Sequence, residues 1–388
     1  MQNSIDFYVL SSGNMNALNG AAKFVKIFEE NKKYFNDNNI NITVISNSAY
    51  FSSETEYRKT LKYSVRHFLN KLAAGSKIGS TLKFYYRLVG QGKPPVDEFS
   101  RIIDNDKAVV LLNDFFVAHE FYKKFGKKHK TIFMLHNNGD MLSMIEGEVL
   151  RTKAFKDKLY KMRDTIAGCS DKFVCVAKPA VEYFSKLHEK NKDKVIYIPI
   201  GQKSADVLNT RKYNKLRLVS VGTVCERKNQ IALLEALNNI PDKTIELTLV
   251  GGGPMLDKCK KYAEQNSIQG QVTFAGAQTD VIPFLKSANV YIMSSIDEGL
   301  PISAQEAMNY SLPLILTDVG GCSELISENG ILTSTDVNEI MGAIVSLNDN
   351  KDMLKKMGET SKKIFEERYT LDIMLGKYVQ CISGILSD

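Results

Sequence analysis

The chain has 388 residues and a net charge of +7 at pH 7, with 44% hydrophobic and 24% charged residues. Since one domain usually holds about 100–200 residues, this length predicts two domains. The composition is that of a globular protein and excludes disordered and fibrous classes. The apolar runs are far shorter than the ~20 residues of a membrane-spanning helix, and no basic region precedes the first one. We therefore expect a cytoplasmic protein.

The cysteines and histidines do not form metal-ligand patterns. No C-x-x-C pair occurs, and the chain has only five histidines. Isolated thiols are typical of a reducing cytosol, and a zinc site is not expected. The six cysteines are Cys169, Cys175, Cys225, Cys259, Cys322 and Cys381.

The positive charge is concentrated in the N-terminal half of the chain. Residues 1–200 carry a net charge of +11, whereas residues 201–388 carry −4. Residues 57–96 contain nine basic residues and no acidic residue. This distribution favours an anionic partner on the N-terminal side.

Short apolar runs alternate with segments of helical periodicity, which predicts parallel sheets covered by helices on both faces. In the first half, strands are predicted over 5–10, 40–45, 108–112, 130–135, 172–176 and 195–198. The predicted helices of this half cover 20–35, a stretch ending near 128, 147–166 and a stretch ending at 188.

Apolar density drops over residues 199–214, which predicts a linker between two domains, 1–200 and 205–388. The second series has predicted strands at 216–221, 245–250, 272–275, 290–293 and 314–317. Its predicted helices cover 230–238, 254–266, 281–287, a stretch from Pro301, 337–347, 351–368 and 371–386. We expect no strand after residue 317, and the last helix could cross back to the N-terminal domain.

Loops that follow parallel strands are where ligands bind in such folds. Residues 11–22 form one such loop, with small residues that suit either an anion site or a plain tight turn. Residues 221–230 form another and place Arg227 and Lys228 at a helix start. Cations there oppose the helix dipole unless they meet an anion, so they are either phosphate ligands or a solvated pair.

Three further loops follow strands in the second half. Residues 251–254 hold three glycines and a proline, which suit a side-chain-free turn before a helix. Residues 294–301 lead into a helix with Glu306, so Glu298 and Glu306 either bind vicinal hydroxyls or are two solvated glutamates. Residues 317–324 contain a glycine pair that also suits a tight turn.

Taken in order, these loops resemble those of a known enzyme family. The order is Gly222 to Lys228, then three glycines from Gly251, then E-G-L-P-I-S-A-Q-E ending at Glu306, then D-V-G-G-x-x-E from Asp318. It is similar to that of the retaining glycosyltransferases of family 4 over residues 216–332. The resemblance implies an α/β protein of the GT-B fold, with two facing Rossmann-like α/β/α domains, parallel sheets and an interdomain cleft.

The resemblance also implies a role for individual residues. Glu306 would hold the ribose of a nucleotide-sugar, Glu298 would face the donor sugar, and Lys228 would neutralise the departing diphosphate. His136 would reach the transferred sugar, while alone it suits a strand-end histidine. Thr223 departs from the family, which commonly has arginine there. The implied donor-binding set is Gly20, Gly222, Arg227, Lys228, Gly251, Gly252, Glu298, Gly299, Leu300, Pro301 and Glu306, with Lys228, Glu298 and His136 as the catalytic set.

The implied reaction is transfer of a hexosyl unit from a nucleotide-sugar, expected to be UDP-linked, to a hydroxyl of a glycan or lipid-linked acceptor, with retention. A lysine and a helix N-terminus can stabilise the leaving diphosphate without a metal, and no D-x-D motif occurs. We therefore expect neither a metal nor another cofactor, and no protein nucleophile. Cell-surface polysaccharide or glycolipid synthesis is the expected setting.

The basic residues between 58 and 93 alternate with apolar residues at helical spacing. This segment is either a helix packed on the N-terminal sheet with a solvated lysine face, or an attachment site for the inner face of the cell membrane. A nucleic-acid partner is not expected, because no helix-turn-helix, zinc module or aromatic platform is present.

Three other functions remain open at this point. A nucleotide-sugar epimerase or a phosphorylase would use the same architecture. A non-catalytic carbohydrate-binding partner subunit would also have this architecture, and the departure at Thr223 keeps that alternative open.

Overall fold

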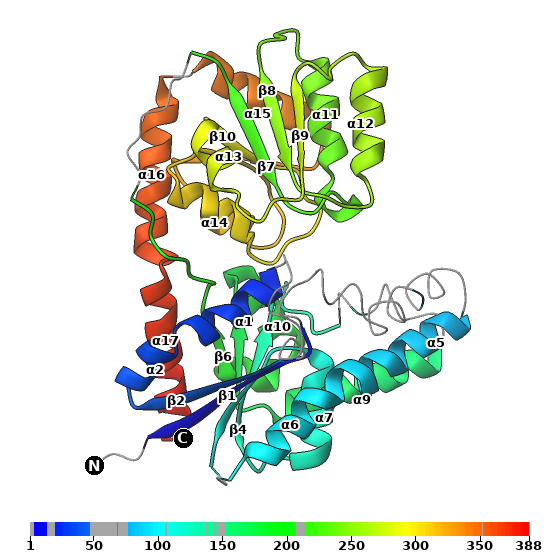
Figure 1. The fold of residues 1–388 in the computed structure, drawn as a ribbon, viewed down its shortest axis with the longest axis vertical. Coiled ribbons are helices and arrows are strands. Elements are labelled where there is room, and N and C mark those ends of the chain that lie inside the picture. The colour runs from blue at the N-terminus through cyan, green and yellow to red at the C-terminus, as the bar shows by residue number, and fades with distance from the viewer. Residues whose placement is uncertain are drawn as a thin grey trace. The chain divides into compact units, whose positions relative to one another are not determined.

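The computed structural model describes residues 4–13, 20–46, 68, 77–104, 107–136, 138–142, 145, 153–206, 214–350 and 352–387 (Figure 1). The chain forms two compact units. Unit 1 comprises Met1–Ile198 together with Leu375–Asp388, and unit 2 comprises Pro199–Met374. Each unit contains a parallel sheet, as the alternation of apolar runs and helical segments predicts.

The sheet of unit 1 has the strand order β2-β1-β3-β4-β5-β6, and all of its described pairings are parallel. Its central strands are short and buried on both faces, which is why they appear in the sequence as continuous apolar runs. The strands are β1 (Ile5–Ser11), β2 (Ile40–Ser46), β3 (Val109–Leu112), β4 (Lys130–Leu135), β5 (Lys172–Cys175) and β6 (Val195–Tyr197).

The two faces of this sheet are covered by different helices because successive side chains of a strand point to opposite faces. Phe7 of β1 packs against Phe28 and Phe35, with both ring centroids 6.0 Å away. The next residue, Tyr8, packs against Phe99 at 5.0 Å. The helices are α1 (Gly20–Glu30), α2 (Lys32–Asp37), α5 (Lys77–Tyr85), the π-helical turn η2 (Tyr86–Gly92), α6 (Lys93–Ile102), α7 (Phe115–Phe125), α9 (Lys153–Cys169), α10 (Lys178–Leu187) and the 3-10 segment η3 (Glu189–Lys194).

The helix predicted over 20–35 is divided in two at Asn31. The Asn31 side chain donates a hydrogen bond to the carbonyl of Ile27 at 2.7 Å. Short amide side chains compete with the backbone for such carbonyls, so the helix ends at Glu30 and α2 begins at Lys32.

The last helix, α17 (Leu371–Ile385), begins in unit 2 and ends in unit 1. Its Tyr378 is fully buried, and its ring lies 5.0 Å from the ring of Phe28 and 6.2 Å from that of Phe24. The Tyr378 hydroxyl donates to the sulfur of Met134 at 3.4 Å. These contacts explain why Leu375–Asp388 belong to unit 1. The prediction allowed for this, since it let the last helix of the range 205–388 cross back to the N-terminal domain.

The sheet of unit 2 has the order β12-β11-β10-β7-β8-β9 and is also parallel. Numbered from its first strand, this is the 3-2-1-4-5-6 order of the Rossmann fold. The strands are β7 (Arg217–Val221), β8 (Glu246–Val250), β9 (Val272–Gly276), β10 (Val290–Met293), β11 (Leu314–Thr317) and β12 (Gly330–Thr333).

The prediction that no strand follows residue 317 is wrong, because β12 pairs with β11. Asn329-Gly330 has the composition of a turn, which hides the start of this strand. A Cβ atom on Gly330 would lie 2.2 Å from the carbonyl oxygen of Leu314, so the glycine permits close pairing of the two strands. The buried Asn329 side chain closes the preceding turn by donating to the carbonyl of Leu325.

The helices of unit 2 lie on both faces of its sheet (Figure 1). Helices α11, α12 and α15 pack together over one face and enclose an apolar core with the strands, while α14 and α16 pack together. The elements are the 3-10 turn η4 (Glu226–Lys228), α11 (Gln230–Asn239), α12 (Leu256–Gln265), α13 (Ile282–Ser287), α14 (Ile302–Asn309), the 3-10 turn η5 (Cys322–Leu325), α15 (Val337–Asp349) and α16 (Met353–Arg368). No helix in the part of the chain that the structure describes is long and apolar enough to cross a membrane.

The first residues of unit 2 are fixed to the segment before α17. The Gln202 amide donates to the carbonyl of Tyr369 at 3.0 Å, and the Leu371 amide donates to the carbonyl of Gln202 at 2.8 Å. A Cβ atom on Gly201 would lie 2.4 Å from the carbonyl oxygen of Thr370. The residues that enter unit 2 and those that leave it are therefore held side by side within that unit.

The aromatic contacts of α1 yield the first prediction. Replacing Phe28 by alanine should lower the free energy of unfolding by about 3–5 kcal/mol, because a fully buried aromatic side chain is removed. Urea unfolding followed by circular dichroism measures this change. Tyr183→Ala, at a 47% exposed position of α10, is the matched control and should stay within about 0.5 kcal/mol. Equal effects of the two variants would contradict the assignment of this core.

Candidate functional site

Unit 2 has a topological switch point between β7 and β10. These strands are neighbours, but the chain continues from β7 toward β8 on one side and from β10 toward β11 on the other. The loops after two such strands diverge and leave room at the carboxyl edge of the sheet, where ligands bind in open α/β folds. The loop from Gly222 to Asn229 and the loop from Ser294 to Pro301 occupy this place.

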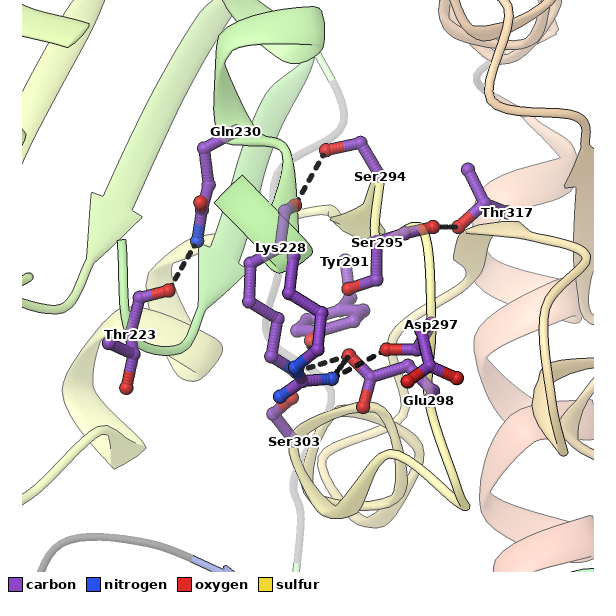
Figure 2. A network of polar contacts seen from close by, with 11 residues as sticks. Thr223, Lys228, Gln230, Tyr291, Ser294, Ser295, Asp297, Glu298, Ser303 and Thr317 are labelled. Atoms are coloured by element: carbon purple, nitrogen blue, oxygen red, sulfur yellow. Dashed lines mark hydrogen bonds and ion pairs between the residues drawn. The ribbon is translucent and has the colours of Figure 1, made fainter. Parts of the chain in front are cut away.

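Three charged side chains meet at the switch point. Lys228 Nζ lies 2.5 Å from Glu298 Oε1, and Arg227 Nη1 lies 3.3 Å from the same oxygen. Figure 2 shows Lys228 pointing at Glu298. The side chains of Glu298 and Lys228 are 8% and 14% exposed, whereas that of Arg227 is 46% exposed. One buried carboxylate therefore faces two cations.

Backbone contacts hold the same two loops together. The Ile296 amide donates to the carbonyl of Arg227 at 2.9 Å, and Arg227 Nη1 donates to the carbonyl of Asp297 at 2.5 Å. The Ser294 hydroxyl donates to the carbonyl of Asn229 at 2.8 Å. Asn229 has φ of 48°, and asparagine tolerates this left-handed conformation better than most residues. The cations are thus held on a fixed frame.

The second carboxylate, Glu306, lies on α14 and is half-buried. Both Glu298 and Glu306 raise the pKa of Tyr291, although burial of that phenol is the larger cause. The Tyr291 hydroxyl shares a hydrogen bond of 2.7 Å with Ser303 Oγ, also drawn in Figure 2. Since both carboxylates act on one phenol, the structure brings the two predicted glutamates to the same part of unit 2.

The predicted glycine loops pack against each other. A Cβ atom on Gly251 would lie 1.9 Å from the carbonyl oxygen of Gly222, and one on Gly253 would lie 2.2 Å from that of Val224. The Val224 amide donates to the carbonyl of Gly252 at 2.9 Å. These glycines therefore allow the loops after β7 and β8 to approach closely, whatever ligand they also bind.

The fifth loop supports Glu298 from the other side. The Gly321 amide donates to the carbonyl of Gly299 at 2.6 Å. Gly320 has φ of +55°, and a Cβ atom there would lie 1.8 Å from the carbonyl oxygen of Glu298. The glycine pair of residues 320 and 321 thus fixes the backbone on which Glu298 stands.

Helix α14 begins directly after the loop that carries Glu298. Pro301 is the N-cap residue, with an extended conformation, and the helix begins at Ile302. Leu300 and Pro301 are buried, while Gly299 is half-buried. The first amides of a helix have no partner within the helix, so this end favours an anion.

The predicted residues Gly20 and His136 belong to unit 1. Gly20 is the first residue of α1, and His136 follows β4. The rings of Phe24 on α1 and His136 lie edge to face, with centroids 5.1 Å apart. Burial lowers the pKa of His136 to about 4, so its imidazole is neutral at pH 7.

Sequence reasoning missed the polar residues around His136. Asn113 follows β3, and its side-chain oxygen lies 2.8 Å from His136 Nε2. Asn113 Nδ2 donates to Ser11 Oγ at the end of β1, at 3.1 Å. The neighbouring Asp114 caps α7 by accepting from the Val117 amide, and burial raises its pKa. The available signal was that Ser11, Asn113 and His136 each directly end a buried strand.

Two other predictions depend on the described residues only in part. Half of the basic segment 58–93 lies outside them, since only Phe68 and residues 77–93 are described. Within residues 77–93, Leu82, Tyr85 and Val89 are exposed by 46%, 47% and 57%. No group of three or more histidine, cysteine, aspartate or glutamate residues that could hold a metal is found among the described residues. Metal independence stays a prediction.

The second prediction concerns Gly320. Replacing it by alanine should destabilise unit 2 by about 1–3 kcal/mol and displace Glu298, because φ is positive and the new Cβ would overlap the Glu298 carbonyl. Thermal unfolding measures the loss. Gly270→Ala is the control, since a Cβ there meets nothing within 4 Å. A Gly320→Ala protein as stable as the control would show that this loop does not restrain Glu298.

Comparison with known proteins agrees with this geometry. Residues 202–364 match the family model of Glycosyl transferases group 1. An uncharacterized glycosyltransferase of Methanocaldococcus jannaschii is 26% identical, over 56% of this chain and 58% of its own length. The Escherichia coli UDP-Gal:alpha-D-GlcNAc-diphosphoundecaprenol alpha-1,3-galactosyltransferase is 24% identical, over 50% and 55% respectively. The matches thus span little more than half of these relatives.

Similarity in fold extends along nearly the whole chain. The crystal structure of Anabaena HepE in complex with UDP has a TM-score of 0.68 at 13% identity, covering 98% of this chain and 100% of that one. The predicted GT-B fold class, with two parallel-sheet α/β units, is therefore confirmed. The predicted resemblance to glycosyltransferases is confirmed at the level of the group 1 model for residues 202–364, whereas family 4 and retention stay predictions.

Proposed function

We propose that the chain is a retaining glycosyltransferase that moves a hexosyl unit from a UDP-sugar to a hydroxyl of a glycan or lipid-linked acceptor. Its product would belong to cell-surface polysaccharide or glycolipid. UDP is proposed because the Anabaena neighbour binds UDP and the E. coli relative is named for UDP-Gal. The name of the E. coli relative also includes a diphosphoundecaprenol acceptor, which supports a lipid-linked one here.

The observation that carries the proposal is the pair of cations on one buried carboxylate at the switch point of unit 2. A carboxylate can neutralise only one of the two cations. Arg227 is nearly half exposed, so its charge is available to a ligand, and the N-terminus of α14 follows Glu298 within a few residues. Cations beside a helix N-terminus favour a phosphate group.

In the proposed reaction, the bond between the anomeric carbon and the diphosphate oxygen breaks while the acceptor oxygen bonds to that carbon, and the proton of the acceptor hydroxyl passes to the departing diphosphate. Negative charge then grows on the UDP leaving group. Lys228, Arg227 and the first amides of α14 would stabilise that charge as it develops, and such fixed groups need no reorganisation during the reaction. The chain itself supplies these cations, so we propose that no metal ion is required.

The two glutamates have separate proposed roles. Glu306 would accept hydrogen bonds from the ribose hydroxyls, and Glu298 would accept them from the donor sugar. The ion pair of Glu298 with Lys228 orients the carboxylate before the donor binds. No side chain is proposed as a nucleophile, since retention in this proposal comes from attack on the same face that the diphosphate leaves.

The third prediction tests the cation. Lys228→Ala should lower kcat of transfer, or of slow donor hydrolysis, by about 10²–10³-fold, as loss of a group that stabilises a developing anion usually does. Glu306→Ala should mainly raise KM for the nucleotide-sugar, because ribose contacts are the same before and during the reaction. Turnover is measured over a panel of UDP-sugars, with EDTA present and absent.

Lys355→Ala, at an exposed position of α16, is the matched control and should keep wild-type turnover. Wild-type rates for Lys228→Ala would contradict the site. An isomerised UDP-sugar as product would identify an epimerase, and a requirement for inorganic phosphate would identify a phosphorylase. UDP binding by thermal shift without any turnover would identify a non-catalytic subunit. The exposed Thr223, where the family commonly has arginine, would then account for the missing activity.

We also propose that residues 77–93 attach the protein to the inner face of the cell membrane. Leu82, Tyr85 and Val89 follow one another at helical spacing and are exposed, so they form one apolar face. Residues 77–93 include four basic residues and no acidic one. An apolar face with basic neighbours has the chemistry of an anionic membrane surface, where a lipid-linked acceptor would lie.

The fourth prediction tests this attachment. The protein should sediment at low salt with vesicles of phosphatidylglycerol mixed with phosphatidylcholine, and not with phosphatidylcholine alone. Leu82→Asp with Val89→Asp should weaken binding about tenfold or more, since two apolar side chains no longer enter the lipid. Leu187→Asp, at a 45% exposed position of α10, is the control. Binding to RNA in place of vesicles would contradict the proposal.

A further inference from the structure

Three polar side chains form a chain of hydrogen bonds across the carboxyl edge of the unit 1 sheet. Ser11 ends β1, Asn113 follows β3, and His136 follows β4. Asn113 lies between the other two, with its oxygen 2.8 Å from His136 Nε2 and its nitrogen 3.1 Å from Ser11 Oγ. Ser11 and Asn113 are 2% and 4% exposed, so water does not replace these bonds.

The order of donors in this chain determines where the proton of His136 lies. Ser11 Oγ accepts hydrogen bonds from the Gly13 amide and from Asn113 Nδ2. The Asn113 oxygen lies 2.8 Å from Nε2 of the imidazole, and a carbonyl oxygen can only accept. Nε2 of His136 must then carry the hydrogen, which leaves Nδ1 as the unprotonated nitrogen.

We propose that Asn113 is a positioning residue that locks His136 in the Nε2–H tautomer, so that Nδ1 accepts a hydrogen bond from a hydroxyl of the transferred sugar. The inference rests on the proposed function, because it needs a sugar at this edge. Ser11 extends the same chain of hydrogen bonds by accepting from the Asn113 side-chain nitrogen.

Two further observations support the lock. The Phe24 ring stands edge to face with the imidazole at 5.1 Å and an interplanar angle of 80°, which restrains rotation of the ring. No hydrogen bond to His136 Nδ1 is found in the described part of the chain. Burial also keeps the imidazole neutral near pH 7, the state in which one nitrogen accepts. A neutral hydrogen-bond acceptor can bind a hydroxyl, whereas it offers neither a donor nor a positive charge to a phosphate.

The test begins with the tautomer, which is read by long-range ¹H–¹⁵N correlation on the full chain labelled at histidine. The five histidines are distinguished by the loss of one signal in His136→Gln. We expect a pyrrole-type Nε2 and a pyridine-type Nδ1 for His136. Asn113→Leu should give a mixture of tautomers, while Asn113→Asp should keep Nε2–H and raise the pKa of His136. A wild-type Nδ1–H tautomer would overturn the inference.

The role in transfer is tested with a double-mutant cycle. Asn113→Leu alone should lower kcat/KM for the UDP-sugar roughly tenfold, the scale typical of partners that orient a functional histidine. In the His136→Gln background, the Asn113→Leu change should lower kcat/KM no further, because the histidine that Asn113 orients is absent. Equal losses in both backgrounds would show a purely structural role. If Asn113→Leu fails to fold, Asn113→Ala, which also removes the accepting oxygen, takes its place in the cycle.

Ligand additions separate this inference from the proposed function. UDP-glucose, UDP-galactose and UDP-N-acetylglucosamine are added to the labelled protein, with UDP as the control. We expect a shift of the Nδ1 signal with at least one UDP-sugar and none with UDP. Absence of binding by UDP and by all three sugars would count against the proposed function. Binding that leaves the Nδ1 signal in place would overturn the sugar contact alone.

Discussion

The ion pair between Glu298 and Lys228 is the interaction on which the ligand end of unit 2 depends. A carboxylate that is only 8% exposed has lost most of its hydration, and that loss is offset only by close, well-directed partners. Lys228 supplies the nearer charge and Arg227 the second, while backbone bonds join the loops that carry them. Removing Lys228 would leave the buried carboxylate with the more distant Arg227 alone, so the contacts between the two loops hold the switch point together.

The glycines of unit 2 follow from the same constraint. For the loops after β7 and β10 to meet, their neighbours must approach without side chains. Gly251 approaches the backbone at Gly222, and Gly320 approaches it at Glu298, each at a distance that a Cβ atom would forbid. A glycine pattern that resembles a ligand-binding motif is therefore also a packing pattern. This explains why individual glycine loops were ambiguous in the sequence and why only their order, together with Glu298 and Glu306, was informative.

The sequence predicted the features that depend on local pattern. Continuous apolar runs identified all described strands except β12, which begins at Gly330 directly after Asn329, and this pair has the composition of a turn. The division at Asn31 was missed because it depends on one side-chain hydrogen bond to Ile27. The sequence indicated Arg227 and Lys228. That both contact one carboxylate, 70 positions after Lys228, could not be predicted, because it depends on the order of the strands in the sheet. Asn113 was missed because its significance comes from neighbours on two other strands.

The carboxyl edges of the two sheets present different side chains, and these side chains do not follow the net charge of the half of the chain to which they belong. In unit 2 the edge presents two cations although residues 201–388 are acidic overall. In unit 1 the edge presents a neutral imidazole and an amide although residues 1–200 carry +11. Net charge therefore does not indicate where an anion binds. In the proposed function, the diphosphate would bind the local cations of unit 2, a sugar hydroxyl would bind the neutral acceptor of unit 1, and the excess positive charge of the N-terminal half would serve the proposed membrane surface.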